Sequence, residues 1–381
     1  MGHVLILGGT GRIGCSIAED LLAHSDVEIF LAGRQVEKGR ALAARLGDRV
    51  QFCQLDLSVA TELRRAIAAV DLVVHAAGPF HYRRAQVLRA CIAQQVNYLD
   101  VSDYRGFTRQ ALALDGEARA AGITAIINAG VFPGISNSMV RQGVEALDQA
   151  DSVQLSYVVA GSGGAGVTVM RTTFLGLQYP FDAWLDGRWQ SVKPYTERER
   201  LAFPLPYGTG AVYWYDMPEA MTLANSFDLQ NVKTKFGVVP DFYNQATWLM
   251  AHGLPSAVLR NSKVVEFLAR VSYGMTGISD RFTGTGVAIR CDIQGRQNDE
   301  PTQYCSFFVH DSAAIAAGNG AGYIAALMMS RQLDQPGVFP VEQIVPTSLF
   351  ITALQRRKLD ILVSPLSSLT GDHQVKKSQV L

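Results

Sequence analysis

The residues with the clearest chemical potential form a glycine-rich run near the start of the chain. Residues 8–14 read Gly-Gly-Thr-Gly-Arg-Ile-Gly and contain the spacing Gly-x-Gly-x-x-Gly. Glycines at this spacing permit a tight turn, a close approach to a pyrophosphate and the packing of a helix on a strand. An apolar strand pattern precedes the run and a helical pattern follows it, so free N–H groups at a helix N-terminus can meet phosphates. A plain strand-to-helix turn is the alternative, but we expect a nucleotide at Gly9, Thr10, Gly11, Arg12, Ile13 and Gly14.

The residues after the second expected strand indicate which nucleotide is bound. An NAD-selective site usually holds Asp or Glu about 20 residues beyond the glycine loop, whereas this chain has Gly33 and Arg34 there. An acid would repel a 2′-phosphate, and arginine can pair with one through two hydrogen bonds. Arg12 offers a second positive charge. The sequence therefore favours NADP(H), with the alternative that Arg34 only faces solvent.

Two further strand ends are expected to contact the cofactor. Asp56 and Leu57 end the third strand, where side chain and backbone can meet the adenine, although Asp56 could equally cap the next helix. The fourth strand ends in small residues that let the backbone run beside the cofactor. These residues are Ala77, Gly78 and Pro79.

The candidate acid–base residues follow the fourth and fifth strands. Hydride transfer needs a proton donor or acceptor beside the nicotinamide, and Tyr82, Asp100 and Asp103 are placed for that role. The alternatives are an exposed helix start for the tyrosine and turn capping for the two acids. Arg171 can bind a substrate carboxylate through its planar fork or form a structural ion pair.

The residue patterns that short-chain dehydrogenases and common metal sites require are absent from the sequence. No tyrosine has lysine four positions later, which argues against the chemistry of short-chain dehydrogenases. The seven histidines contain no His-x-x-x-His pair and the five cysteines contain no Cys-x-x-Cys pair, so we expect no metal site. An odd number of cysteines without such spacing is typical of a reducing compartment, and we expect a cytoplasmic protein.

The first 135 residues alternate apolar strands with amphipathic helices, and this pattern predicts a doubly wound parallel sheet of the Rossmann type. The expected strands are 4–7, 27–32, 50–55, 72–76, 97–101 and 124–128. The expected helices are 13–24, 37–46, 60–69, 85–94 and 108–121.

The pattern changes after this domain. We expect residues 136–310 to form a second α/β or α+β domain for substrate binding or dimerisation, with a strand at 153–159. A strand hairpin is expected at 286–294 and 302–310. The C-terminal helices of 311–360 are expected to pack back on the first domain, and the tail of 361–381 to be disordered.

Composition limits the function classes further. The chain has 381 residues, with 34 Lys and Arg against 34 Asp and Glu, which argues against a nucleic-acid binder. Hydrophobic residues make up 48% of the chain, enough for a packed core. The longest apolar stretch, 313–329, contains Asn319 and several glycines, and predicts a buried helix rather than a membrane span. Charges are few and aromatic residues frequent between Leu205 and Leu259, which favours a subunit interface, here of a homodimer, or an apolar pocket.

Several motifs together resemble one family. These motifs are the glycine loop 8–14, Ala77-Gly78-Pro79-Phe80, Asn97-Tyr98-Leu99-Asp100, Gly130-Val131-Phe132-Pro133-Gly134 and Gly337-Val338-Phe339-Pro340. The chain resembles the saccharopine dehydrogenase-like oxidoreductases, most clearly over residues 1–140 and 285–357. The resemblance implies a substrate-side acid at Asp100 and substrate contacts at Phe80, Tyr98, Phe132 and Arg171.

The resemblance also implies a reaction. The named member of that family catalyses the NADP-linked reduction, with hydride from NADPH, of an imine formed between an amino acid and an aldehyde or keto acid. Other members act on different substrates, some of them lipid-like, and residues 161–166 and 174–215 depart from the saccharopine-making enzymes. We therefore expect an NADP(H)-dependent oxidoreductase that acts on a C=N, C=O or C=C bond of a small or apolar substrate. The alternative is a sensor or assembly factor that binds NADP(H) without turnover, because no acid–base pair is unambiguous.

Overall fold

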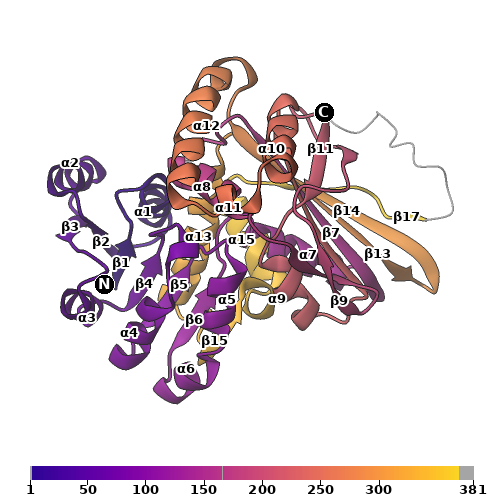
Figure 1. The fold of residues 1–381 in the computed structure, drawn as a ribbon. Helices are drawn as coiled ribbons and strands as arrows, with labels where there is room; N and C mark the ends of the chain where they lie inside the picture. Colours follow the sequence, from indigo (N-terminus) through magenta and orange to yellow (C-terminus); the bar gives the residue numbers. More distant parts are fainter. Residues whose placement is uncertain (1, 165, 369–381) are drawn as a thin grey trace. The chain divides into compact units, whose positions relative to one another are not determined.

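The computed structural model describes residues 2–164 and 166–368 and divides them into two compact units (Figure 1). Unit 1 holds Met1–Asn137, Ala165–Thr172 and Ser312–Ala353. Unit 2 holds Ser138–Gly164, Thr173–Asp311 and Leu354–Leu381. Each unit has its own sheet.

The sheet of unit 1 has seven strands in the order β15-β6-β5-β4-β1-β2-β3. Every neighbouring pair is parallel. Because the order reverses at β1 and β4, the carboxyl ends of these strands form the place where such sheets bind ligands. The strands are β1 (His3–Leu7), β2 (Glu28–Gly33), β3 (Val50–Gln54), β4 (Leu72–His75), β5 (Asn97–Asp100), β6 (Thr124–Ile127) and β15 (Gly337–Pro340).

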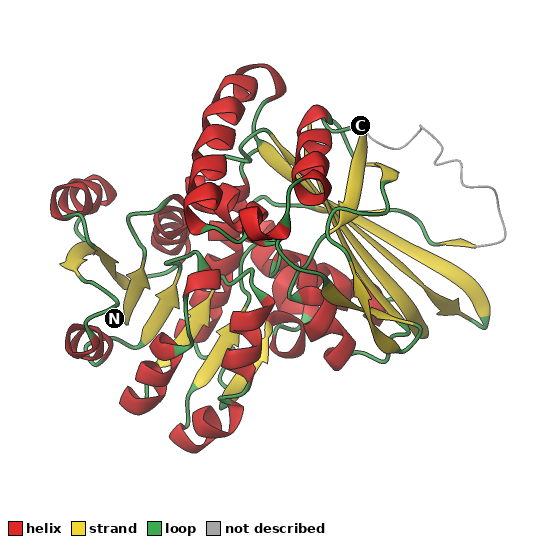
Figure 2. Ribbon diagram, in the orientation of Figure 1, coloured by secondary structure: helices red, strands yellow, loops and turns green. Residues whose placement is uncertain are grey.

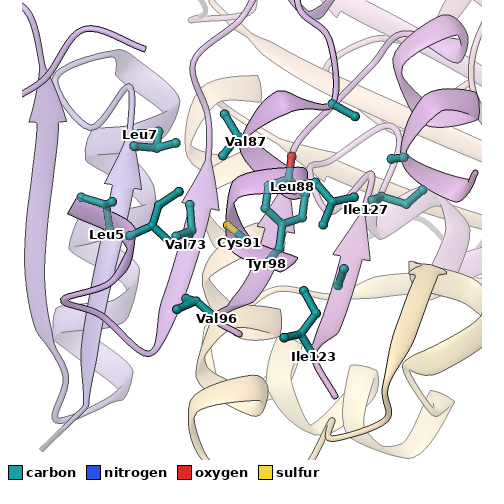
Figure 3. Packing of buried hydrophobic residues seen from close by; sticks show 14 of the residues in the cluster. Leu5, Leu7, Val73, Val87, Leu88, Cys91, Val96, Tyr98, Ile123 and Ile127 are labelled. Carbon is teal, nitrogen blue, oxygen red and sulfur yellow. The ribbon is translucent and has the colours of Figure 1, made fainter. Parts of the chain in front are cut away.

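Helices cover both faces of this sheet (Figure 2). On one face, side chains of α3, α4, α5 and α6 pack on alternate strand residues such as Leu5, Val73 and Tyr98, and Figure 3 shows part of this cluster. On the other face α1 packs against α13. The helices that contribute to unit 1 are α1 (Arg12–His24), α2 (Val36–Leu46), α3 (Ala60–Ile67), the 3₁₀ turn η1 (Phe80–Tyr82), α4 (Gln86–Gln94), α5 (Arg105–Leu112), α6 (Asp115–Ala121), α13 (Ala313–Met329) and α14 (Val341–Ile344).

The parallel α/β class predicted from the sequence is confirmed, with two local differences. The expected helix 108–121 is two helices, α5 and α6. Asp115 begins α6, and its carboxylate accepts a hydrogen bond from the backbone of Val338 at 2.9 Å. The seventh strand, β15, pairs with β6 more than 200 residues earlier in the chain. Both differences depend on contacts between distant residues, which local patterns do not encode.

The apolar stretch 313–329 is helix α13, and it is largely buried. Its glycines permit close packing, because a Cβ at Gly318 would lie 2.7 Å from the backbone carbon of Ser16. A Cβ at Gly322 would likewise meet the side chain of Asp20. Of the helices that the structure describes, none combines the length and hydropathy that a membrane span requires.

Unit 2 is built on a mixed sheet of ten strands, whose main path is β10-β11-β12-β7-β13-β14-β16. Only β12 and β7 pair in parallel along this path, and the strands next to them are antiparallel. The strands are β7 (Gln149–Ala160), β8 (Phe181–Leu185), β9 (Arg188–Val192), β10 (Glu199–Ala202), β11 (Thr209–Trp214), β12 (Asn231–Val239), β13 (Gly286–Gln297), β14 (Glu300–His310), β16 (Ile361–Val363) and β17 (Ser367–Ser368).

Helices α9 and α10 pack against β12 of this sheet. The helices of unit 2 are α9 (Glu219–Ser226), α10 (Phe242–Gly253), α11 (Ser256–Leu259) and α12 (Ser262–Thr283). Three more helices contribute residues to both units, namely α7 (Ile135–Glu145), α8 (Val167–Leu175) and α15 (Thr347–Arg356).

The structure agrees with the expected hairpin and differs in the tail. Strands β13 and β14 form the predicted hairpin and pair from Val287 with His310 to Gln297 with Glu300. The segment expected to be disordered begins with ordered backbone instead, because β16 and β17 both pair with β14. The apolar residues Ile361, Leu362 and Val363 suit a strand. The rest of the expected tail, 369–381, lies outside the described residues.

Aromatic residues of unit 2 divide between core and surface. Tyr213 and Trp214 on β11 are buried, and Tyr213 stacks on Tyr195 with ring centroids 4.7 Å apart. By contrast, Trp248 and Leu249 on α10 are exposed by 47% and 63%. Much of the aromatic content therefore forms the core of unit 2, while α10 presents apolar side chains to solvent.

Candidate functional site

The glycine loop connects β1 to α1 and leaves almost no room for side chains. A Cβ at Gly14 would lie within 3 Å of the backbone of Gly8 and Gly9. A Cβ at Gly9 would lie 3.0 Å from the carbonyl oxygen of Ile6 and 2.8 Å from Leu31. The sequence has glycine at these positions because the start of α1 packs directly on the strands.

Gly8, the residue before the predicted motif, is as constrained as the motif itself. Its φ of +79° lies in the left-handed region, which favours glycine. A Cβ there would lie 2.8 Å from the carbonyl oxygen of Ala76 and 2.9 Å from the Cα of Ala77. Sequence reasoning omitted Gly8, although the pair Gly8-Gly9 was a signal that the turn needs more than the three motif glycines.

The N-terminus of α1 has the properties of a phosphate site. Gly11 is the N-cap and contributes no side-chain hydrogen bond to the first turn, which contains no acidic residue. The helix dipole and the N–H groups of a first turn favour an anion. Together with the glycine cradle, this end of α1 fits the diphosphate of a dinucleotide, and exposed Arg12 adds a positive charge beside it.

The end of β2 carries a positive charge. Arg34 follows Gly33 and is exposed, and it makes no hydrogen bond or ion pair with the residues that the structure describes. A Cβ at Gly33 would lie 3.0 Å from the hydroxyl of Thr10, so the end of β2 borders the glycine loop. An unpaired guanidinium beside a dinucleotide loop fits a phosphate group better than a pair of ribose hydroxyls.

Asp56 lies in the turn after β3. Its Oδ1 accepts hydrogen bonds from the backbone N–H and the hydroxyl of Ser58, at 2.9 and 2.8 Å. These bonds lower the pKa of Asp56 below its usual value, and the positive charges of Arg34 and Arg83 lower it further. The N-cap of α3 is Val59, so Asp56 stabilises the turn before the helix rather than capping the helix itself.

The loop after β4 borders both the glycine loop and helix α8. Ala77 lies against Gly8, as described above, and a Cβ at Gly78 would lie 3.5 Å from the methyl group of Thr168. Arg171 is partly exposed and lies three residues further along α8. The structure thus brings the helix that carries Arg171 to the loop predicted to run beside the cofactor.

Asp100 ends β5 and is fully buried. Its Oδ1 accepts hydrogen bonds from the backbone N–H groups of Ser102 and Asn128, at 2.9 and 3.0 Å. Burial raises the pKa of Asp100 to about 6, while these hydrogen bonds oppose the rise. The carboxyl therefore joins the end of β5 to the end of β6.

Asn128 completes this junction. Its φ is +62°, and its side-chain amide donates to the carbonyl oxygen of Ser102 at 2.7 Å and to the hydroxyl of Thr108 at 2.8 Å. The residue is fully buried. Its type was a signal in the sequence, because Asn tolerates the left-handed region better than most residues.

Two predicted substrate residues lie in the core of unit 1. Tyr98 is fully buried, and its hydroxyl lies 3.1 Å from Nδ1 of His75. Phe80 is 3% exposed and packs edge-to-face on Phe107, with centroids 4.9 Å apart. Both side chains fill the space between the sheet and its helices, so we do not retain them as substrate contacts.

The remaining predicted residues lie nearer the surface. Asp103 is partly exposed, and its surroundings raise its pKa to about 6 through desolvation. Tyr82 is 55% exposed on η1. Its neighbour His81 stacks on Tyr104 with ring centroids 3.9 Å apart, and burial lowers the pKa of His81 to about 4. Phe132 is partly exposed in the loop after β6.

Known proteins resemble both the sequence and the fold. Residues 4–126 match the family described as the saccharopine dehydrogenase NADP binding domain. Carboxynorspermidine synthase of Vibrio cholerae is 24% identical over 385 residues, which cover 89% of this chain and 91% of that protein. A trans-acting enoyl reductase of Mycobacterium leprae is 29% identical over 140 residues, covering 36% of this chain and 34% of that protein.

A solved structure extends the likeness to the whole fold. Saccharopine dehydrogenase (L-Glu forming) of Saccharomyces cerevisiae superposes with a TM-score of 0.70, covering 96% of this chain and all of that one. Their identity is 14%, so this likeness concerns the fold alone. The family match and the mycobacterial relative support a dehydrogenase or reductase at the level of broad class. As the sequence resemblance predicts, residues 4–126 match the saccharopine dehydrogenase NADP-binding domain, and this match supports NADP(H) as the cofactor.

Proposed function

We propose that the protein reduces a C=N bond of a small substrate with NADPH and so forms a secondary amine. The observation that carries this proposal is a pair of carboxyl groups at and just after the carboxyl end of β5, where sheets of this type bind ligands: Asp100 is buried and Asp103 is partly exposed. Desolvation raises the pKa of both groups to about 6. An imine accepts hydride best as its protonated cation, and an ionised carboxylate stabilises a cation. The Vibrio relative, named for a carboxylated polyamine, supports an amine-containing product.

The cofactor site proposed from the sequence fits the described geometry. The N-terminus of α1 and residues 9–14 hold the diphosphate, and Arg34 pairs with the 2′-phosphate. The turn of Asp56 and Leu57 borders the adenine. When bound, NADPH supplies the hydride from its nicotinamide ring. The loop of Ala77, Gly78 and Pro79 then contacts the nicotinamide end of the cofactor.

The two acids have separate roles in this proposal. Asp103 is partly exposed. In this proposal it lies beside the substrate nitrogen, whose cationic form it stabilises. Hydride adds to the imine carbon, the C=N electron pair moves to nitrogen, and the proton already on nitrogen stays there. Asp100 is buried and positions the loops after β5 and β6 through its two backbone hydrogen bonds. Tyr82 is exposed on the neighbouring turn, where in this proposal it contacts the substrate.

A carboxylate on the substrate suits Arg171. The start of α8 lies against Gly78, so Arg171 belongs to the helix next to the nicotinamide loop. A guanidinium binds a carboxylate through two parallel hydrogen bonds and so fixes its orientation. Phe132, in the loop after β6, supplies an apolar contact beside it.

Reduction of a C=C bond is the second candidate. The match to a mycobacterial enoyl reductase favours it, although that match covers about a third of each chain. The two reactions differ in what the site must stabilise. An enoyl substrate develops negative charge on oxygen and needs hydrogen-bond donors there, whereas a protonated imine is positive and needs carboxylates.

We also propose that residues 136–310 supply the substrate and dimerisation surfaces of a homodimer in a reducing, cytoplasmic setting. Exposed apolar residues on α10, among them Phe242, Trp248 and Leu249, support an interface there. Light scattering after size exclusion tests this: wild type should run as a dimer, and Leu249→Asp should shift it toward monomer.

The experiment for the reaction itself is a substrate screen with NADPH. Amines mixed with aldehydes or keto acids supply imines, and enoyl thioesters supply C=C bonds. We expect NADPH oxidation only with the imine mixtures, and a loss of at least about ten-fold in kcat/KM for Asp103→Asn. Oxidation with enoyl thioesters alone would favour the second candidate. Tight NADPH binding without turnover of either class would favour a sensor or assembly factor.

A further inference from the structure

A second arginine, Arg83, is fixed beside the cofactor loops. It follows the 3₁₀ turn η1, and its backbone N–H donates to Phe80 at 3.0 Å. Its Nε donates to the carbonyl oxygen of Ala77 at 3.1 Å. Since Ala77 lies against Gly8, the guanidinium is anchored to the same stretch of backbone that borders the phosphate loop.

The segment that follows Arg83 reaches the loop after β3. The side-chain amide of Gln86 donates to the carbonyl oxygen of Leu57 at 3.3 Å. The backbone N–H of Leu55 donates to Gly33 at 3.0 Å, which brings the same loop beside the end of β2. Arg83 therefore belongs to a segment that bridges the carboxyl ends of β4 and β3, on the side of the sheet where Arg34 follows β2.

Three charged side chains influence one another electrostatically in this area: Arg34, Arg83 and Asp56. Burial and the charge of Arg34 lower the pKa of Arg83, while Asp56 raises it. Both arginines in turn lower the pKa of Asp56. One carboxylate, which already accepts two hydrogen bonds from Ser58, is left to balance two guanidiniums. The cluster keeps a net positive charge and suits an anion.

We propose that Arg83 is the second cation of the 2′-phosphate site and, with Arg34, sets the preference for NADP(H) over NAD(H). This proposal rests on the cofactor site proposed above. A phosphate monoester carries a charge of about −1.5 to −2 at pH 7, which two guanidiniums match. Because Nε of Arg83 is held by Ala77, its terminal N–H groups remain to bind two phosphate oxygens, as a bidentate contact requires.

Two other roles for Arg83 give different results. If Arg83 only supports the loop after β4, its loss changes stability and the affinity for both cofactors together. If it stacks on the adenine, its loss weakens the binding of NADPH and of NADH equally, because both cofactors carry that ring. Only a contact to the 2′-phosphate weakens NADPH and leaves NADH unchanged.

The test is direct titration of the full chain with NADPH, NADH and 2′,5′-ADP, without any substrate. Arg83→Gln keeps a side-chain N–H for Ala77 and removes the charge, and Arg83→Lys keeps the charge and removes the planar fork. Arg84→Ala is the matched control, because Arg84 is an adjacent exposed arginine without a hydrogen bond or ion pair among the described residues.

We expect Arg83→Gln to raise the Kd of NADPH and of 2′,5′-ADP by about 10-fold to 100-fold and that of NADH by less than two-fold. Arg83→Lys should give a Kd for NADPH between those of wild type and Arg83→Gln. Arg84→Ala should bind both cofactors with the Kd values of wild type. Equal weakening of NADPH and NADH binding, or no change in the binding of either, would overturn the proposal. If Arg83→Gln does not fold, the same comparison of the two cofactors is made with Arg83→Lys. A wild-type protein that prefers NADPH yet reduces no imine would refute the proposed reaction and leave this inference standing.

Discussion

Replacement of Asp100 by asparagine should make the protein more stable at neutral pH. The carboxyl of Asp100 is fully buried, and its Oδ1 accepts two backbone hydrogen bonds, from Ser102 and Asn128. An asparagine side chain offers a carbonyl oxygen to the same two N–H groups. The substitution therefore keeps the junction of β5 and β6 and removes the burial of a charge.

The size of the effect follows from the pKa. Burial raises the pKa of Asp100 to about 6. The ordinary value is about 3.9, and each pKa unit corresponds to about 1.4 kcal/mol, so ionised Asp100 costs about 3 kcal/mol at pH 7.5. Between about pH 4 and pH 6 the folded state binds more protons than the unfolded state, so stability falls as the pH rises through this window. Below pH 4 the cost is absent.

The assay is urea unfolding of wild type and Asp100→Asn between pH 4 and pH 8. The variant should gain up to about 3 kcal/mol over wild type at pH 7.5 and little at pH 4. Asp103 titrates in both proteins, so its contribution cancels when the free energy of unfolding of wild type is subtracted from that of the variant at each pH. Asp100→Ala is the control, because it orphans two buried N–H groups and should lose about 2–6 kcal/mol. A difference between wild type and Asp100→Asn that does not change with pH would refute the reasoning.

Three further substitutions test other parts of the structure. Gly14→Ala should abolish NADPH binding, measured by titration, because its Cβ would meet the backbone of Gly8 and Gly9. Arg34→Ala should raise the Kd of NADPH by about 10-fold to 100-fold and leave NADH unchanged, and equal effects on both would contradict its assignment to the 2′-phosphate. Asn137→Ala removes two hydrogen bonds: the 2.7 Å bond that its side-chain amide donates to buried Glu342, and the 2.8 Å bond that its Oδ1 accepts from the backbone N–H of Gly134. Thermal unfolding should therefore show a loss of stability of at least about 1.5–3 kcal/mol, and an unchanged melting curve would count against these bonds.

The sequence predicts the cofactor half of the fold well because its signals are local. Glycine spacing, strand period and helix period each lie within a few residues, and the first six strands of unit 1 follow from them. The seventh strand, β15, and the helix break at Asp115 depend on contacts between residues more than 200 positions apart. Such contacts leave no periodic signal.

The candidate site also divides into features with a local sequence signal and features that depend on contacts between distant residues. Positions in the glycine loop were identifiable from residue type alone, whereas the environment of an acid was not. Asp100 and Asp103 look alike in the sequence, yet one is fully buried and the other partly exposed. Tyr98 and Phe80 belong to motifs that suggest a site, but both pack in the core. Burial depends on the assembled helices, so it had to come from the structure.

The central claim is the transfer of hydride to a C=N bond, and isotope transfer tests it most directly. The full chain is incubated with NADPH that carries deuterium at nicotinamide C4, in the position from which hydride is transferred. The substrate is an imine formed from an amine and an aldehyde that carries a carboxylate group. We expect a secondary amine with one deuterium on the carbon bonded to nitrogen, detected by mass spectrometry. A product without deuterium, or deuterium delivered only to the β-carbon of an enoyl substrate, would contradict it.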